Sequence, residues 1–172
     1  MWNCPLRAAA PAALVACALA AVASPARAAL GGAPMPTPSD ATTTIVSPTA
    51  RVASAATSAA TSGTVAAPQY SVHSTVFSSG TNVREYVGAD GTVFGIAWNG
   101  PRMPDLQTLL GNYFPQYASG VQALHAARRG RGPVAVEQST LVVHSGGHMG
   151  SFFGQAWLPS ALPAGMTGAD IK

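Results

Sequence analysis

The side chains with the clearest capacity for chemistry are two histidines near the C-terminal end of the sequence. His144 and His148 are four residues apart, a spacing at which two imidazoles on one helix can bind a metal ion. Two glycines between them disfavour a helix, so a shared site requires a loop and a third ligand, for which His73 and His125 are the candidates. The simpler interpretation is that one histidine lies at a strand end and the other lies in a turn. We therefore expect no metal and no other cofactor.

The other catalytic patterns are incomplete. Ser145 precedes two glycines, as in the Ser-Gly-Gly sequence of serine proteases, but the preceding Gly-Asp is missing and no Gly-x-Ser-x-Gly elbow occurs. A glycosidase needs two carboxylates at a fixed separation. The carboxylates in the body of the domain are Glu85, Asp90, Asp105 and Glu137. Asp90 fits a turn and Asp105 a helix start, whereas Glu85 and Glu137 either face each other or pair with arginines. These patterns favour a protein that is not an enzyme.

One charge cluster is dense enough to bind an anion. Arg128, Arg129 and Arg131 lie within four residues and could hold a phosphate, a lipid head group or an acidic glycan. The alternative is that these arginines complement the negative end of a helix and solvate a loop. The cluster is therefore a candidate anion site with a structural alternative.

The first 28 residues have the layout of a cleavable secretory signal. Arg7 forms a short basic region, residues 8–23 are almost entirely apolar, and Ala26-Arg27-Ala28 is an A-x-A cleavage site. A competing pattern is that of a lipoprotein, in which Cys17 would be lipidated, but the residues after Cys17 stay apolar. We expect cleavage after Ala28 and export to the periplasm or the medium, with no transmembrane span in the mature chain.

Removal of the signal changes the bulk properties of the chain. Both cysteines and two of the nine basic residues are removed with it. The mature chain has seven basic and six acidic residues and a formal charge of +1. The mature chain then has no thiol chemistry and no field that would attract nucleic acid. Residues 29–68 are rich in Ala, Ser, Thr and Pro and are expected to form a largely disordered linker. Residues 69–172 are expected to form a single domain.

The hydrophobic pattern of that domain predicts an α+β fold. Residues 70–77, 82–87 and 93–98 read as three strands with turns between them, the third apolar on both faces and hence central. Two helical stretches follow, one starting after Asp105 and one ending near Arg129. Residues 134–137, 140–144 and 151–158 read as three more strands. We expect one antiparallel sheet, built from three strands, helices and three strands, with the helices on one face.

Several phrases in this order resemble an uncharacterised proteobacterial family, the domain of unknown function 2844 family. They are Ala29-Leu30-Gly31-Gly32-Ala33, Arg84-Glu85-Tyr86-Val87, Asp90-Gly91-Thr92-Val93-Phe94-Gly95, Pro104-Asp105-Leu106 and Ser145-Gly146-Gly147-His148-Met149. The resemblance covers the mature chain except the linker. It implies a small exported protein and supplies no activity, fold or catalytic residue. The residues and the resemblance together indicate a non-enzymatic binding or accessory protein of the cell envelope, whose partner is an envelope protein or a glycan.

The signal assignment predicts the N-terminus of the mature protein. Intact-mass and N-terminal peptide mass spectrometry of protein purified from the producing cells should show a chain that begins at Ala29. A chain that begins with a lipid-modified Cys17 would contradict the prediction and would place the protein on a membrane.

Overall fold

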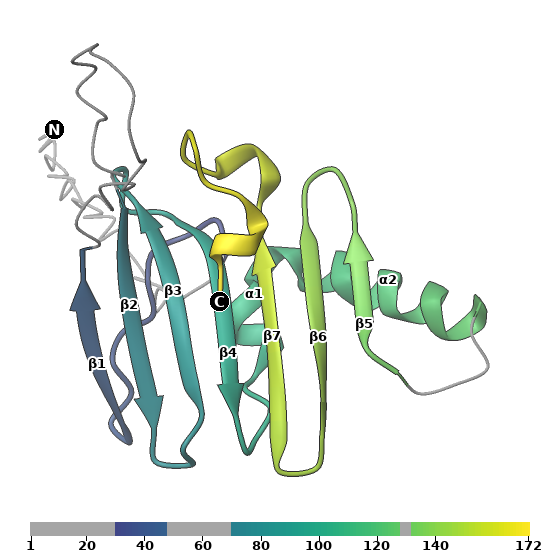
Figure 1. Cartoon of the computed structure of the whole chain (residues 1–172), viewed down its shortest axis with the longest axis horizontal. Helices are drawn as coiled ribbons and strands as arrows, with labels where there is room; N and C mark the ends of the chain where they lie inside the picture. Colours follow the sequence, from purple (N-terminus) through teal and green to yellow (C-terminus); the bar gives the residue numbers. More distant parts are fainter. Residues whose placement is uncertain (1–29, 48–69, 128–131) are drawn as a thin grey trace, which may run out of the picture.

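The computed structural model describes residues 30–47, 70–127 and 132–172, which form one antiparallel sheet with helices (Figure 1). The strand order is β1-β2-β3-β4-β7-β6-β5, and every neighbouring pair is antiparallel. The strands are β1 (Ala41–Val46), β2 (Tyr70–Phe77), β3 (Asn82–Gly88), β4 (Val93–Gly100), β5 (Val134–Glu137), β6 (Val142–His148) and β7 (Ser151–Trp157). The expected α+β class with a single antiparallel sheet is confirmed.

The sheet consists of two meanders that meet in its middle. Strands β1 to β4 follow one another in space as they do along the chain, and so do β5 to β7. The pairing of β4 with β7 joins the two halves and places β4 fourth of seven. Residues Val93 to Trp98 of β4 are all buried, as expected for a strand that is apolar on both faces.

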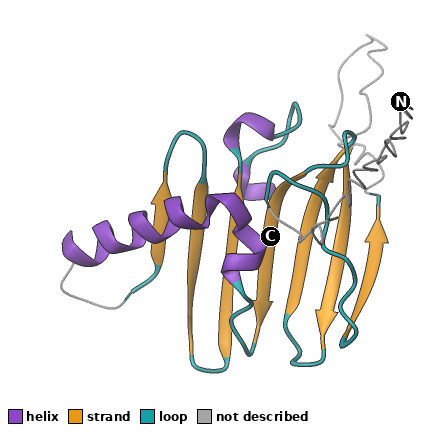
Figure 2. Cartoon of the chain, turned by 180° about the vertical axis from the view of Figure 1, so that it is seen from behind, coloured by secondary structure: helices purple, strands orange, loops and turns teal. Residues whose placement is uncertain are grey.

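The α-helices lie on one face of the sheet, which is the near face in Figure 2. Helix α1 (Leu106–Leu110) is followed by a 3-10 turn (Gly111–Tyr113) and by α2 (Phe114–Ala127). Pro115 lies in the first turn of α2, where a proline loses no hydrogen bond, so the helix continues through it. Within the described ranges, no helix is long and apolar enough to cross a membrane.

The N-terminal part of the expected linker belongs to the fold. Leu30 is only 2 % exposed, and its N–H donates to the Leu109 carbonyl at 3.0 Å. Farther along, β1 pairs with β2 over its whole length. The expectation of one linker over residues 29–68 is therefore wrong for residues 30–47, and the sheet has one strand more than expected. Residues 48–68 lie outside the described residues. We call residues 30–40 the N-terminal strap.

The sheet separates two hydrophobic cores. The larger core lies between the sheet and the helices, where Val83, Ile96 and Trp98 pack with Leu110 and with Leu30 of the strap. The smaller core lies on the other face and is covered by residues that follow β7. Its buried members are Tyr86, Phe94, Ala97 and Ile171. Side chains alternate along β3, as the sequence predicts. Val83 and Glu85 point toward the helices, and Arg84 and Tyr86 point to the opposite face.

The larger core depends on one glycine. Trp98 of β4 lies opposite Gly154 of β7, and its ring covers that residue. A Cβ atom on Gly154 would lie 2.3 Å from the ring atom Cζ2, which is closer than any real contact. Since Trp98 is 2 % exposed and packed on all sides, it cannot move aside without disturbing the core.

We predict that Gly154→Ala destabilises the protein by about 1–3 kcal/mol through overpacking against Trp98. Urea unfolding followed by tryptophan fluorescence measures this change. Gly132→Ala is the matched control, because nothing lies within 4 Å of a Cβ built there. Equal midpoints for the two variants would contradict the prediction.

Candidate functional site

The two histidines with metal-ligand spacing do not form a shared site. Both lie on β6, where four residues correspond to roughly 13 Å along the strand. The His144 Nε2 atom lies 3.0 Å from Glu137 Oε1, and the His148 Nδ1 atom lies 3.1 Å from the Met149 carbonyl oxygen. Among the described residues, no group of three His, Cys, Asp or Glu side chains is placed to hold a metal ion.

The remaining sequence candidates are dispersed or lie elsewhere. Glu85 faces the helices from β3, whereas Glu137 bonds His144 on the opposite face, so the two carboxylates do not form a catalytic pair. Ser145 is buried in β6. The anion-site candidates Arg128, Arg129 and Arg131 and the cleavage site after Ala28 lie outside the described residues.

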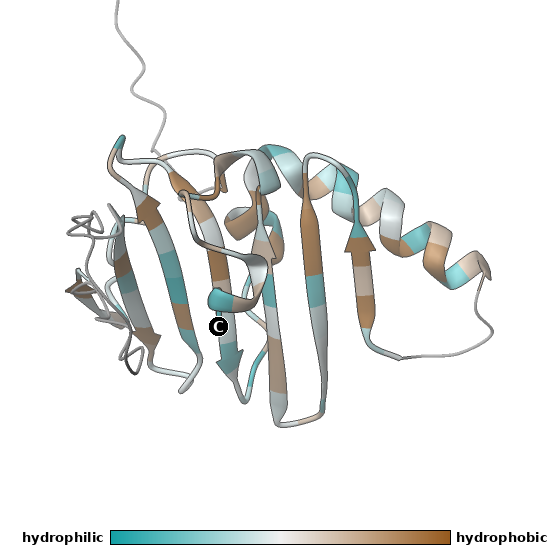
Figure 3. Cartoon of the chain, turned by 45° about the horizontal axis from the view of Figure 1, so that its top comes forward, coloured by the Kyte–Doolittle hydropathy of each residue, from teal (hydrophilic) through white to brown (hydrophobic). Residues whose placement is uncertain are grey.

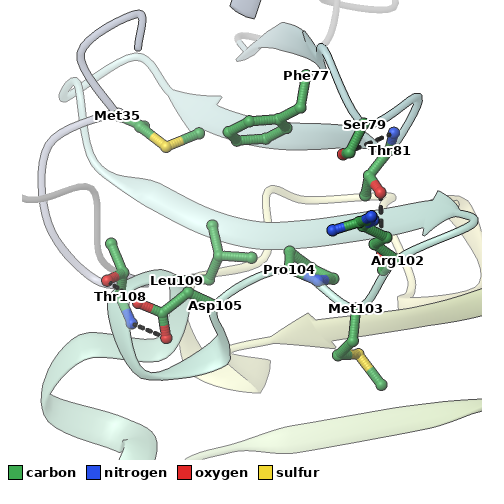
Figure 4. Close-up of a pocket in the computed structure, with 10 residues that line it drawn as sticks. All are labelled: Met35, Phe77, Ser79, Thr81, Arg102, Met103, Pro104, Asp105, Thr108 and Leu109. Atoms are coloured by element: carbon green, nitrogen blue, oxygen red, sulfur yellow. Dashed lines mark hydrogen bonds between the residues drawn. The ribbon is translucent and has the colours of Figure 1, made fainter. Parts of the chain in front are cut away.

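A cleft lies on the helix face, between the strap and the start of α1 (Figure 4). Its volume is about 290 Å³. Met35 and Phe77 stand on one side of the close-up, and Pro104 and Leu109 stand on the other. The cleft is lined by Met35, Phe77, Ser79, Thr81, Arg102, Met103, Pro104, Asp105, Thr108 and Leu109.

One wall of the cleft is fixed by the start of α1. Asp105 is its N-cap, as expected: its Oδ1 atom accepts the Gln107 N–H at 3.0 Å and its Oδ2 atom accepts the Thr108 hydroxyl at 2.5 Å. The loop before it is tied to the β2–β3 turn, because the Thr81 hydroxyl donates to the Arg102 carbonyl at 2.9 Å. These polar groups therefore serve to hold the wall in place.

The other wall is the strap, and a buried carboxyl group holds it. The Met35 N–H donates to both carboxyl oxygens of Glu85, at 3.0 Å and 3.2 Å. Glu85 is 0 % exposed. Burial raises the pKa of Glu85 to about 7, and the Met35 N–H offsets part of that rise. Near neutral pH this carboxyl group is thus divided between its protonated and charged forms.

The groups that the cleft leaves open to a ligand are its apolar walls and one arginine. Asp105 and Thr81 are occupied by structural hydrogen bonds, and Glu85 is not among the residues that line the cleft. The sequence interpretation missed this site because its strap wall was assigned to a linker. The run Thr42-Thr43-Thr44-Ile45-Val46 was the available signal, since β-branched residues favour strands.

Comparison with known proteins gives one family. A family described as "Protein of unknown function (DUF2844)" matches residues 26–171, which is most of the chain. No curated protein and no solved structure matches the chain.

The raised pKa of Glu85 predicts a stability that depends on pH. The folded state holds the proton more tightly than the unfolded state, whose Glu pKa is near 4.5, so the stabilisation is complete below pH 4.5 and is lost as pH rises through 7. The loss attributable to Glu85 is about 3 kcal/mol, from 1.36 kcal/mol per pKa unit.

Urea unfolding of the wild type and of Glu85→Gln between pH 4.5 and pH 8 measures this effect. The glutamine still accepts the Met35 N–H and does not ionise, so the variant should lack this part of the pH dependence. Identical pH profiles of the two proteins would contradict the raised pKa.

Proposed function

The chain belongs to the DUF2844 family of proteins of unknown function, and we propose that it is an exported, non-enzymatic binding protein of the cell envelope. In this proposal the cleft beside α1 receives an apolar side chain of a partner protein. The protein works in the periplasm or outside the cell, after removal of residues 1–28.

Two features of the chain support export. The first 28 residues have the basic, apolar and A-x-A regions of a secretory signal. The family match starts at residue 26, so it leaves out the apolar run and includes the strap. A boundary at this point fits a family whose common part is the mature protein.

The character of the cleft carries the binding proposal. The Thr81, Asp105 and Thr108 side chains hold the walls, so the contact surface consists of the Arg102 side chain and four apolar residues: Met35, Phe77, Met103 and Leu109. Met103 is 42 % exposed, and methionine adapts its shape to a partner because its side chain is unbranched. A volume of about 290 Å³ is at the lower end of small-molecule pockets, so one aromatic or branched side chain is a fitting occupant.

The two alternative functions receive no such support. A metal protein based on His144 and His148 would need the imidazoles to converge, and His144 is bonded to Glu137 instead. Anion binding by Arg128, Arg129 and Arg131 stays a prediction, because these residues lie outside the described ranges. The envelope-binding proposal is the one that the described residues favour.

The proposal predicts that filling the cleft prevents binding. With methyl-labelled methionines, N-acetyl-phenylalanine methylamide should shift the NMR signals of Met35 and Met103, whereas N-acetyl-serine methylamide should not. Ser79→Trp places an indole at the cleft from an exposed turn and should abolish these shifts. Ser160→Trp, at an exposed position outside the cleft lining, should leave them unchanged.

The assay carries its own internal reference. Met149 is 94 % exposed and does not line the cleft, so its signal should stay constant during the titration. Equal shifts of Met149 and Met103 would indicate nonspecific contact and would contradict a site in the cleft.

A further inference from the structure

A second hollow lies on the face of the sheet opposite the helices. It is shallow, has a volume of about 460 Å³ and extends over strands from both meanders. Figure 3 shows that the central strands carry hydrophilic stretches beside their hydrophobic ones. The hollow is lined by Arg84, Ala97, Trp98, Asn99, Pro133, Val134, Ala135, His144, Ser145, Phe153, Gly154, Gln155 and Lys172.

Strand register sets the order of side chains across the hollow. Arg84 of β3 pairs with Ala97 of β4, Ala97 with Gln155 of β7, and Gln155 with His144 of β6. Paired residues in an antiparallel sheet point to the same face, so these four form one row. Arg84 and His144 are three strands apart, or about 14 Å, with Ala97 and Gln155 between them. The row therefore lines the hollow with a cationic group at one end and an imidazole at the other.

The charged side chains that line the hollow are cationic. Arg84 and Lys172 line it, and no described lining residue is Asp or Glu. The Arg84 Nε atom is buried and has no hydrogen-bond partner among the described residues. Because Arg84 lines the hollow, the terminal N–H groups of its guanidinium can donate to a carboxylate there. Glu137, at the far end, is already bonded to His144.

An aromatic ring and amide groups stand beside this cation. Phe153 is 56 % exposed, although it is a large apolar residue in the middle of β7. It pairs in register with Asn99, and Gln155 follows two residues later on the same face. Amide side chains offer both donors and acceptors, which suit hydroxyl groups. The combination of an open aromatic face, amides and an arginine matches a sugar ring that carries an acid group.

We propose that this hollow binds a carboxylate-bearing saccharide, of the uronic acid type. The carboxylate pairs with the Arg84 guanidinium, the apolar face of a ring packs on Phe153, and hydroxyl groups bond to Asn99 and Gln155. The site is separate from the cleft beside α1, and neither proposal depends on the other.

Calorimetric titration of the purified protein with trigalacturonic acid and with its methyl ester tests the proposal. The two probes share a shape and differ in charge, so the acid should bind and the ester should bind at least tenfold more weakly. Arg84→Gln should weaken binding of the acid by about tenfold to a hundredfold. Arg102→Gln, which alters the cleft on the other face, should leave the affinity unchanged.

Two further measurements keep the test decisive. Arg84→Lys retains the charge and should keep part of the affinity, and Phe153→Ala should weaken both probes while circular dichroism stays unchanged. Three results would each overturn the proposal. They are equal binding of the acid and the ester, no binding of either probe, and competition by inorganic phosphate as strong as that by the acid itself. Loss of these affinities in Ser79→Trp would also overturn it, because that variant alters only the cleft.

Discussion

Glu85 sits beneath the N-terminal strap and accepts the Met35 N–H with both carboxyl oxygens. The strap supplies Leu30 to the larger core and Met35 to the cleft, and it leads into β1. A charged carboxylate in this position is costly because burial removes its water. The protein accommodates that cost with a raised pKa and a backbone N–H. Attachment of the strap, and with it one wall of the cleft, is therefore linked to the state of a single proton.

Much of the fold could be read from the sequence, and the exception has a physical cause. The strand at residues 82–87 alternates, the strand at residues 93–98 is apolar on both faces, and Asp105 marks a helix start, so these elements were predictable. The strap and β1 were missed, because Ala, Thr and Pro contribute little apolar surface and the β-branched run of β1 is short. They are held by pairing with β2 and by bonds to Val93, Leu109 and Glu85, which lie far along the chain.

The candidate sites were harder to predict than the elements. The sequence draws attention to His144 and Ser145, but the strand places these neighbours on opposite faces of the sheet. The cleft and the hollow are instead made from residues whose types are ordinary and whose positions are set by register. Arg84 acquires its distinct environment through β4, the next strand along the chain, and through β7, which is far from it in sequence. Neither the composition nor the residue spacing of the sequence indicates that these residues come together.

The contacts of Leu30 constrain the order of events during export. In the route proposed above, the signal peptidase cuts after Ala28, two residues from a side chain that is almost fully buried in the finished fold. Leu30 docks against Leu109 and Leu110, which cross the membrane much later than the cleavage site does. In that route the protease would therefore meet a substrate whose Leu30 is not yet docked, while translocation continues.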